Sequence, residues 1–242
     1  VGTSNDLIVS ERYFDQEYWL NELKNREPLC FTFYPGERPH CYDLLGLEAY
    51  LDQYRATGSQ KYLDAVLGGW AMYRENFKHV GGTTAICESR GPYPPKSCKL
   101  TSGCTGETCG SVFWTNINSR LMQLYPAEEK YAAEIEEAIY NVALACQDTN
   151  GYIRYHNPLH GTKDAPQCHG TCCECAVVGM LSKLPEYIYS TAEDGLWVNL
   201  FAASAITWNQ GSNRVTMTQA TSFPYAPSVR MTVSCATPAT MN

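Results

Sequence analysis

The chain has 242 residues, of which 44% are apolar and 18% are charged, with a formal net charge of −7. This length suits one large domain or one and a half, and an aromatic content of 12% argues against disorder. The net negative charge opposes the phosphate neutralisation that nucleic-acid binding requires, and it makes anionic membranes poor partners. We therefore expect a folded protein that binds no nucleic acid.

No stretch of the sequence predicts a membrane span. The longest apolar candidate, residues 196–208, is shorter than the ~20 residues that cross a bilayer, and it contains Asn199. The sequence starts at Val1 and shows no basic segment followed by an apolar one. We expect any leader to have been removed or to lie outside this sequence.

The first two thirds of the sequence predict helices arranged in pairs. One helix is expected near residues 11–24, and apolar spacings of three and four predict another over 42–57 and a partner over about 61–77. A second pair follows over 107–125 and from about 130, where Ile135, Ile139 and Val142 share one face. The Lys-Tyr dipeptides that open the second member of each pair lie 69 residues apart, which indicates repeated αα units in a bundle, a solenoid or a closed α/α barrel.

The last third changes from helical to alternating patterns. A helix is predicted over residues 172–187, and strands over 197–200, 214–219 and 229–233. Three or four strands are too few for two closed sheets, so we expect the sheet to be completed elsewhere. Residues 236–242 are small and polar and are interpreted as a linker or a truncated end.

Twelve cysteines are the unusual feature of the composition. Glu107 and Cys109 stand at one predicted helix start, and Cys172 and Cys173 stand at another. Three thiolates and a carboxylate suit Zn²⁺, and the positive end of a helix favours thiolate over thiol. The spacing alone leaves a metal site, disulfides and buried thiols as alternatives.

Several motifs resemble, in order, those of the glycoside hydrolase family 127 β-L-arabinofuranosidases, formerly a family of uncharacterised function. The resemblance spans about residues 39–233. It is carried by His40-Cys-Tyr-Asp-Leu-Leu-Gly-Leu, Tyr54-Arg-Ala-Thr-Gly58, Glu107-Thr-Cys109, Tyr140-Asn141, Asn157-Pro158-Leu159, Cys172-Cys173, Tyr187-Ile-Tyr189 and Trp197-Val198-Asn199-Leu200.

The resemblance implies an (α/α)6 barrel followed by a β-sandwich. Because the sequence has room for about one helix before His40, we expect a partial barrel over residues 1–192 that lacks its N-terminal part. The start of a sandwich is expected over 193–235, before the linker or truncated end. The missing half of the barrel would come from the same longer chain or from a neighbouring chain.

The resemblance also implies roles for individual residues. The zinc ligands would be Glu107, Cys109, Cys172 and Cys173, with Cys172 also acting as the nucleophile. A zinc-bound sulfur is already deprotonated, which suits nucleophilic attack. Glu88 is the candidate acid/base, and His40 and Tyr155 match positions that contact the sugar.

These observations lead to a first hypothesis, a zinc-dependent retaining glycoside hydrolase domain that acts on β-L-arabinofuranosides or related glycans. The alternative is a non-catalytic structural or glycan-binding domain of an extracellular assembly, in which zinc stabilises the fold. A third interpretation is a disulfide-rich secreted domain without metal. The abundance of cysteine, together with the glycan substrates of the family, favours an extracellular or secreted location.

Overall fold

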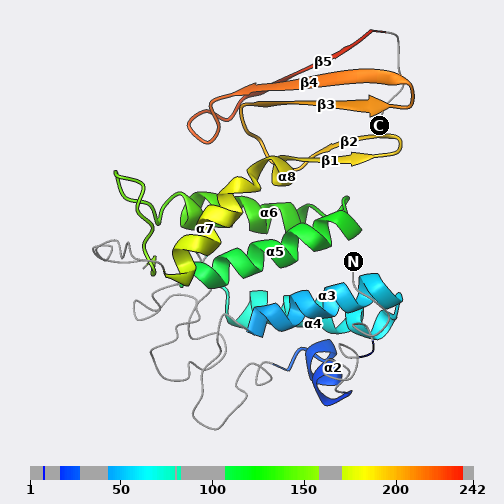
Figure 1. Cartoon of the computed structure of the whole chain (residues 1–242), viewed down its shortest axis with the longest axis vertical. Coiled ribbons are helices and arrows are strands. Elements are labelled where there is room, and N and C mark those ends of the chain that lie inside the picture. Colours follow the sequence, from blue (N-terminus) through cyan, green and yellow to red (C-terminus); the bar gives the residue numbers. More distant parts are fainter. Residues whose placement is uncertain are drawn as a thin grey trace.

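The computed structural model describes residues 8, 17–27, 43–79, 81–82, 107–157 and 171–236. This part of the chain is mainly helical, with a small antiparallel sheet region at its C-terminal end, as the sequence predicts (Figure 1). Its helices are α2 (Glu17–Lys24), α3 (Asp43–Thr57), α4 (Gln60–Asn76), α5 (Thr108–Leu124), α6 (Glu129–Ala138), α7 (Cys172–Ser182) and α8 (Leu184–Ile188), with a π-helical turn, η3 (Ile139–Ala143), after α6. None of these helices has the length and apolarity needed to cross a membrane.

The helices pack as a row with a second layer behind it. In the row, α5 lies between α3 and α7, while α4 packs against α3 and α6 packs against α5 (Figure 1). The short α2 crosses α4 at a glycine, because a Cβ at Gly68 would stand 2.2 Å from the carbonyl oxygen of Leu23. This row sets the positions from which the functional side chains project.

Aromatic side chains join the row to the layer behind it. The rings of Trp70 on α4 and Trp114 on α5 are stacked with centroids 5.7 Å apart, and Trp70 Nε1 donates to Asn118 Oδ1 at 2.8 Å. Glu134 on α6 is buried beside them and accepts from Trp114 Nε1 at 2.9 Å, while Lys78 Nζ lies 2.6 Å from its carboxylate. The buried carboxylate is thus both hydrogen-bonded and paired with a cation, as burial of a charge requires.

The single helix predicted over residues 172–187 is two helices in the structure. α7 ends at Ser182, and α8 begins at Leu184 with a proline, Pro185, in its first turn. Proline has no N–H to donate to the preceding turn, so it suits a helix start and disfavours a helix interior.

The C-terminal region contains a hairpin and a three-stranded sheet. β1 (Tyr189–Ala192) pairs with β2 (Gly195–Val198), and β4 (Asn213–Thr221) lies between β3 (Ser204–Gln210) and β5 (Val229–Cys235), all antiparallel. The predicted strands over 214–219 and 229–233 lie within β4 and β5, whereas the strand predicted over 197–200 shares only residues 197–198 with β2. The sequence analysis predicts neither β1 nor β3. The domain boundary expected after residue 192 falls at the turn of the β1–β2 hairpin, and it stays a prediction.

Polar and aromatic contacts attach the sheet to the rest of the chain. Gln219 Nε2 on β4 donates to Tyr189 Oη at 3.0 Å and to the carbonyl oxygen of Leu200 at 3.2 Å. Phe223, in the β4–β5 loop, meets Tyr140 of the π-helical turn edge-on, with ring centroids 5.9 Å apart. The hairpin and the β4–β5 loop are therefore the links between sheet and helices.

Candidate metal centre

Two helix starts meet at one end of the row. Glu107 immediately precedes α5 and Cys109 lies in its first turn, while Cys172 and Cys173 are the first two residues of α7. One ligand atom from each of these four residues lies within 4.8 Å of the other three. The structure thus brings together the four residues that the sequence analysis proposes as metal ligands.

The start of α5 is held by the segment that follows the π-helical turn. The backbone N–H of Thr108 donates to the carbonyl oxygen of Tyr155 at 3.0 Å, and the Thr108 hydroxyl donates to the same oxygen at 2.9 Å. Glu107 and His156 form an isolated antiparallel bridge, and Asn157 Nδ2 donates to the carbonyl oxygen of Asn141 at 2.5 Å. Residues 155–157 therefore fix the orientation of Glu107 and the first turn of α5.

The start of α7 is held by a capping box. The Thr171 hydroxyl accepts from the Glu174 N–H at 3.4 Å, and the Glu174 carboxylate accepts from the Thr171 N–H at 3.0 Å. This reciprocal pair fixes where the helix begins and hence the directions of Cys172 and Cys173. The sequence analysis did not single out Thr171 and Glu174, although Thr-x-x-Glu before a helix is a recognisable signal.

Burial separates one sulfur from the other ligand atoms. Glu107, Cys109 and Cys173 are 0–1% exposed, whereas Cys172 is exposed. A carboxylate surrounded by sulfur in the interior is stable as an anion only beside a cation or strong donors. Three sulfurs with one carboxylate form a donor set that fits a zinc ion.

The two buried thiols influence each other directly. The hydrogen bond between Cys109 and Cys173, reinforced by burial, raises the pKa of the Cys109 thiol, and the same hydrogen bond lowers the pKa of Cys173. A bound divalent cation would favour deprotonation of both sulfurs.

Tyr155 lies beside the exposed sulfur. Its Oη is 3.8 Å from Cys172 Sγ, and its ring packs with Phe113 and Ala176 against Cys109 and Cys173. The sequence analysis expects Tyr155 to contact the sugar, and this role stays a prediction. The other two predicted site residues, His40 and Glu88, lie outside the described residues.

Comparison with known proteins identifies the family of this chain. The family model described as β-L-arabinofuranosidase, GH127 catalytic domain, matches residues 39–186, which is more than half of the chain. The chain belongs to glycoside hydrolase family 127. A comparison with curated proteins gave no match.

Solved structures share this fold at low sequence identity. A GH127 β-L-arabinofuranosidase from Geobacillus stearothermophilus T6 aligns with a TM-score of 0.72 and 22% identity over 81% of this chain and 33% of its own. A second GH127 β-arabinofuranosidase aligns with a TM-score of 0.71 and 20% identity over 81% of this chain and 31% of its own. A third structure, described as a glycoside hydrolase, aligns with a TM-score of 0.66 and 21% identity over 80% of this chain and 36% of its own. The chain thus spans about a third of the length of these proteins.

Proposed function

We propose that this chain is a zinc-dependent retaining glycoside hydrolase domain that acts on β-L-arabinofuranosides or related glycans. The observation that carries the proposal is the convergence of Glu107, Cys109, Cys172 and Cys173 within 4.8 Å, with only one of the three sulfurs exposed. Membership of family 127 supports the substrate class.

In this proposal, the four converging residues hold the ion. Zinc would supply positive charge that keeps the surrounding sulfurs deprotonated at neutral pH. Glu107, Cys109 and Cys173 are buried and would serve only as ligands, whereas the exposed Cys172 is the sulfur that a substrate can reach. Tyr155, beside Cys172, would bind and orient the sugar ring together with His40.

The hydrolysis would proceed in two displacements at the anomeric carbon. In the first, Cys172 Sγ forms a bond to that carbon while the bond to the leaving oxygen breaks, and Glu88 donates its proton to that oxygen. In the second, water transfers a proton to the Glu88 carboxylate as its oxygen bonds to the anomeric carbon, and the carbon–sulfur bond breaks. The second step regenerates both groups, and the sugar keeps its anomeric configuration.

The architecture that we propose for this function is a partial (α/α)6 barrel over residues 1–192 and the start of a β-sandwich over 193–235, with 236–242 as a linker or truncated end. The rest of the barrel wall would come from a longer chain or from a neighbouring chain. The partner would be an arabinofuranose-containing carbohydrate, and the protein itself would be extracellular or secreted. This scheme is supported by the TM-score of 0.72 to a solved structure of which this chain covers 33%.

The experiment that tests the proposal combines metal analysis with hydrolysis of a nitrophenyl β-L-arabinofuranoside by the full chain. We expect about one zinc per chain and measurable hydrolysis. Cys172→Ser should reduce kcat at least a thousandfold while circular dichroism shows an intact fold. Cys175→Ser, another exposed cysteine in the first turns of α7, is the matched control and should keep full activity. Wild-type activity in Cys172→Ser would overturn the proposal.

One observation favours the alternative, a structural or glycan-binding domain. Four protein ligands, three of them buried, would give a zinc ion a full set of protein donors, which is typical of structural zinc, whereas catalytic zinc usually keeps a position for water. This alternative expects chelation to lower the Tm strongly and Cys172→Ser to leave glycan binding unchanged. Zinc-dependent stability without hydrolysis of any arabinofuranoside would establish it.

A further inference from the structure

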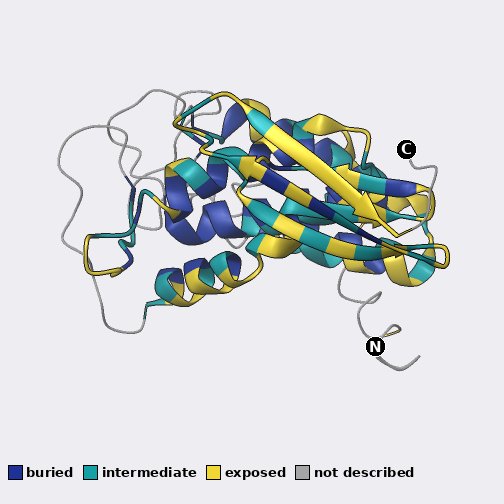
Figure 2. Cartoon of the chain, turned by 90° about the horizontal axis from the view of Figure 1, so that it is seen from above, coloured by how far each residue is buried: buried dark blue, intermediate teal, exposed yellow. Residues whose placement is uncertain are grey.

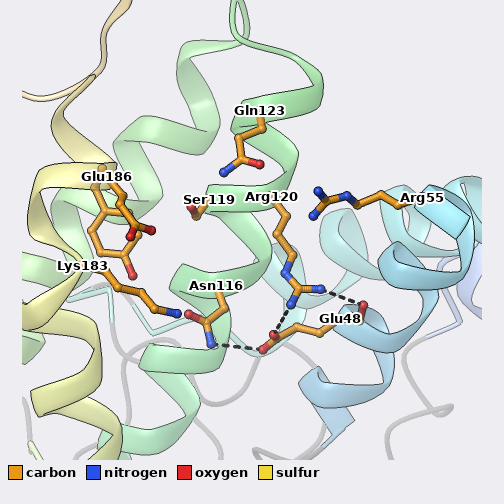
Figure 3. Close-up of a pocket in the computed structure, with 9 residues that line it drawn as sticks. Glu48, Arg55, Asn116, Ser119, Arg120, Gln123, Lys183 and Glu186 are labelled. Atoms are coloured by element: carbon orange, nitrogen blue, oxygen red, sulfur yellow. Dashed lines mark hydrogen bonds and ion pairs between the residues drawn. The ribbon is translucent and has the colours of Figure 1, made fainter. Parts of the chain in front are cut away.

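A second polar site lies farther along the helical row. A cavity of about 220 Å³ opens between α3, α5 and the junction of α7 with α8. Figure 3 shows Glu48 and Arg55 reaching it from α3, Asn116 and Arg120 from α5, and Lys183 from the α7–α8 junction. The family-127 chemistry proposed above uses none of these side chains.

This cavity is distinct from the metal centre. Asn116 follows Cys109 by seven positions on α5, and Lys183 follows Cys172 by eleven at the end of α7. At 1.5 Å per residue, these intervals correspond to about 10 and 16 Å along the helices. A ligand in the cavity would therefore not contact the sulfur cluster.

Tyr187 gives the cavity an unused hydrogen-bonding group. This residue is 1% exposed and lines the cavity, and among the described residues its Oη has no hydrogen-bond partner. Burial, with the nearby carboxylates of Glu186 and Glu48, raises the pKa of Tyr187 to about 12, so the phenol stays neutral. A buried hydroxyl without a partner is unfavourable, and a bound ligand would remove that penalty.

The charges around the cavity are almost balanced. Glu48 accepts from Asn116 Nδ2 at 3.4 Å, and its carboxylate lies 3.6 Å from Arg120 Nη2. Arg120 Nη1 also pairs with the Asp52 carboxylate at 2.7 Å. The lining contains three cations and two carboxylates, and Asp52 stands just beyond them. Such a site lacks the strong positive field that would select a phosphate or another anion.

The donors and acceptors instead match hydroxyl groups, each of which can both donate and accept. Glu48 supplies an acceptor, Lys183 supplies donors, and Asn116, Ser119 and Gln123 supply groups of both kinds. The volume is below the ~300–1,000 Å³ of pockets for drug-sized ligands, which suits a single ring. We propose that this cavity is a second carbohydrate site, which binds one neutral sugar residue independently of the metal centre.

The test is calorimetric titration of the full chain with L-arabinose. We expect saturable binding in the millimolar range. Tyr187→Phe should weaken this binding about tenfold without lowering the Tm, because it removes only the buried hydroxyl. Tyr73→Phe, at another buried tyrosine outside the cavity, is the matched control and should bind as the wild type does. Gln123→Ala, at an exposed lining residue, is a second variant that does not endanger the fold and should weaken binding at least threefold.

Two further titrations distinguish the chemical class of the ligand and locate its binding site. Galacturonate and inorganic phosphate should bind at least tenfold more weakly than L-arabinose, and in the Cys172→Ser background Tyr187→Phe should weaken L-arabinose binding by the same factor as in the wild type. Absence of saturable L-arabinose binding, or tighter binding of phosphate, would overturn the proposal. It would equally fail if binding were lost in Cys172→Ser and kept in Tyr187→Phe, since the sugar would then occupy the metal centre.

Discussion

The helical row and the three-stranded sheet differ in how far each buries its own side chains. In the row, apolar residues such as Leu44, Leu51 and Trp114 are fully buried by neighbouring helices. In the sheet, only the central strand β4 buries side chains, whereas nearly all of β5 is exposed (Figure 2). Within the described residues, the helices of the row therefore bury one another's apolar side chains, whereas the sheet leaves most of its side chains exposed. Substitutions should have large effects in the row and small ones in the sheet.

The largest contrast is expected between two cysteines. Cys173→Ala, at the buried start of α7, should abolish metal binding, since it removes one of four converging ligands. Cys235→Ala, at the exposed end of β5, should leave the zinc content unchanged. Elemental analysis of both purified variants measures the difference. Equal zinc in the two proteins would show that the cluster is not the metal site.

A buried carboxylate should give the next largest effect. Glu134→Ala leaves Lys78 without one of its partners and Trp114 Nε1 without its acceptor. Loss of one member of a buried pair costs about 3–5 kcal/mol, and the nearby Glu137 should keep this loss near the lower value. Glu193→Ala, in the exposed β1–β2 turn, should change the free energy of unfolding by less than about 0.5 kcal/mol. Urea unfolding measures both.

A rise in pH above 10 should destabilise the helical region through ionisation of a buried tyrosine, Tyr187. Tyr187 has a pKa of about 12 when folded, against about 10 in an unfolded chain, so the folded state resists ionisation. Its contribution to stability is complete below pH 10 and is lost as the pH rises towards 12. The free energy of unfolding should fall by about 2–3 kcal/mol over this pH range because of Tyr187. This part of the fall should be absent in Tyr187→Phe. Tyr225→Phe, at a fully exposed position beyond β4, should leave the profile as it is.

The smallest expected effect concerns the cap of α7. Thr171→Ala breaks the capping box and should lower the free energy of unfolding by about 1 kcal/mol. Ser234→Ala, on the exposed β5, should change it by less than about 0.5 kcal/mol. Equal losses in the two variants would mean that the start of α7 is not held by its cap.

Helices were the easiest part of this fold to predict. The apolar spacing predicts residues 42–57 and 61–77, and the structure has α3 over Asp43–Thr57 and α4 over Gln60–Asn76. This spacing is local information, because one face of each helix must be apolar to pack. The break at Lys183 was missed because the apolar spacing continues through Pro185 into α8.

Strands β1 and β3 depend on partners that the sequence does not identify. Ser190 and Thr191 give β1 no apolar alternation, and β1 forms because β2 pairs with it across a short turn. Likewise, β3 lies in a stretch whose strand state follows from its pairing with β4. Such pairing is a property of the assembled sheet rather than of either segment.

The candidate site was predictable only in part. Cysteine spacing left metal, disulfides and buried thiols open, and the ligand set came from the ordered motifs that resemble family 127. The structure adds the convergence of the two helix starts, the place of Tyr155 beside Cys172 and the capping box. The cavity at Tyr187 could not be predicted, because its residues are dispersed over three segments that only the packing brings together.

Cys172 and Cys173 are adjacent in sequence but are not equivalent in chemistry. Successive helix residues point about 100° apart, so the start of α7 turns one sulfur outward and the next inward. A small alkylating reagent should therefore label Cys172 well before Cys173.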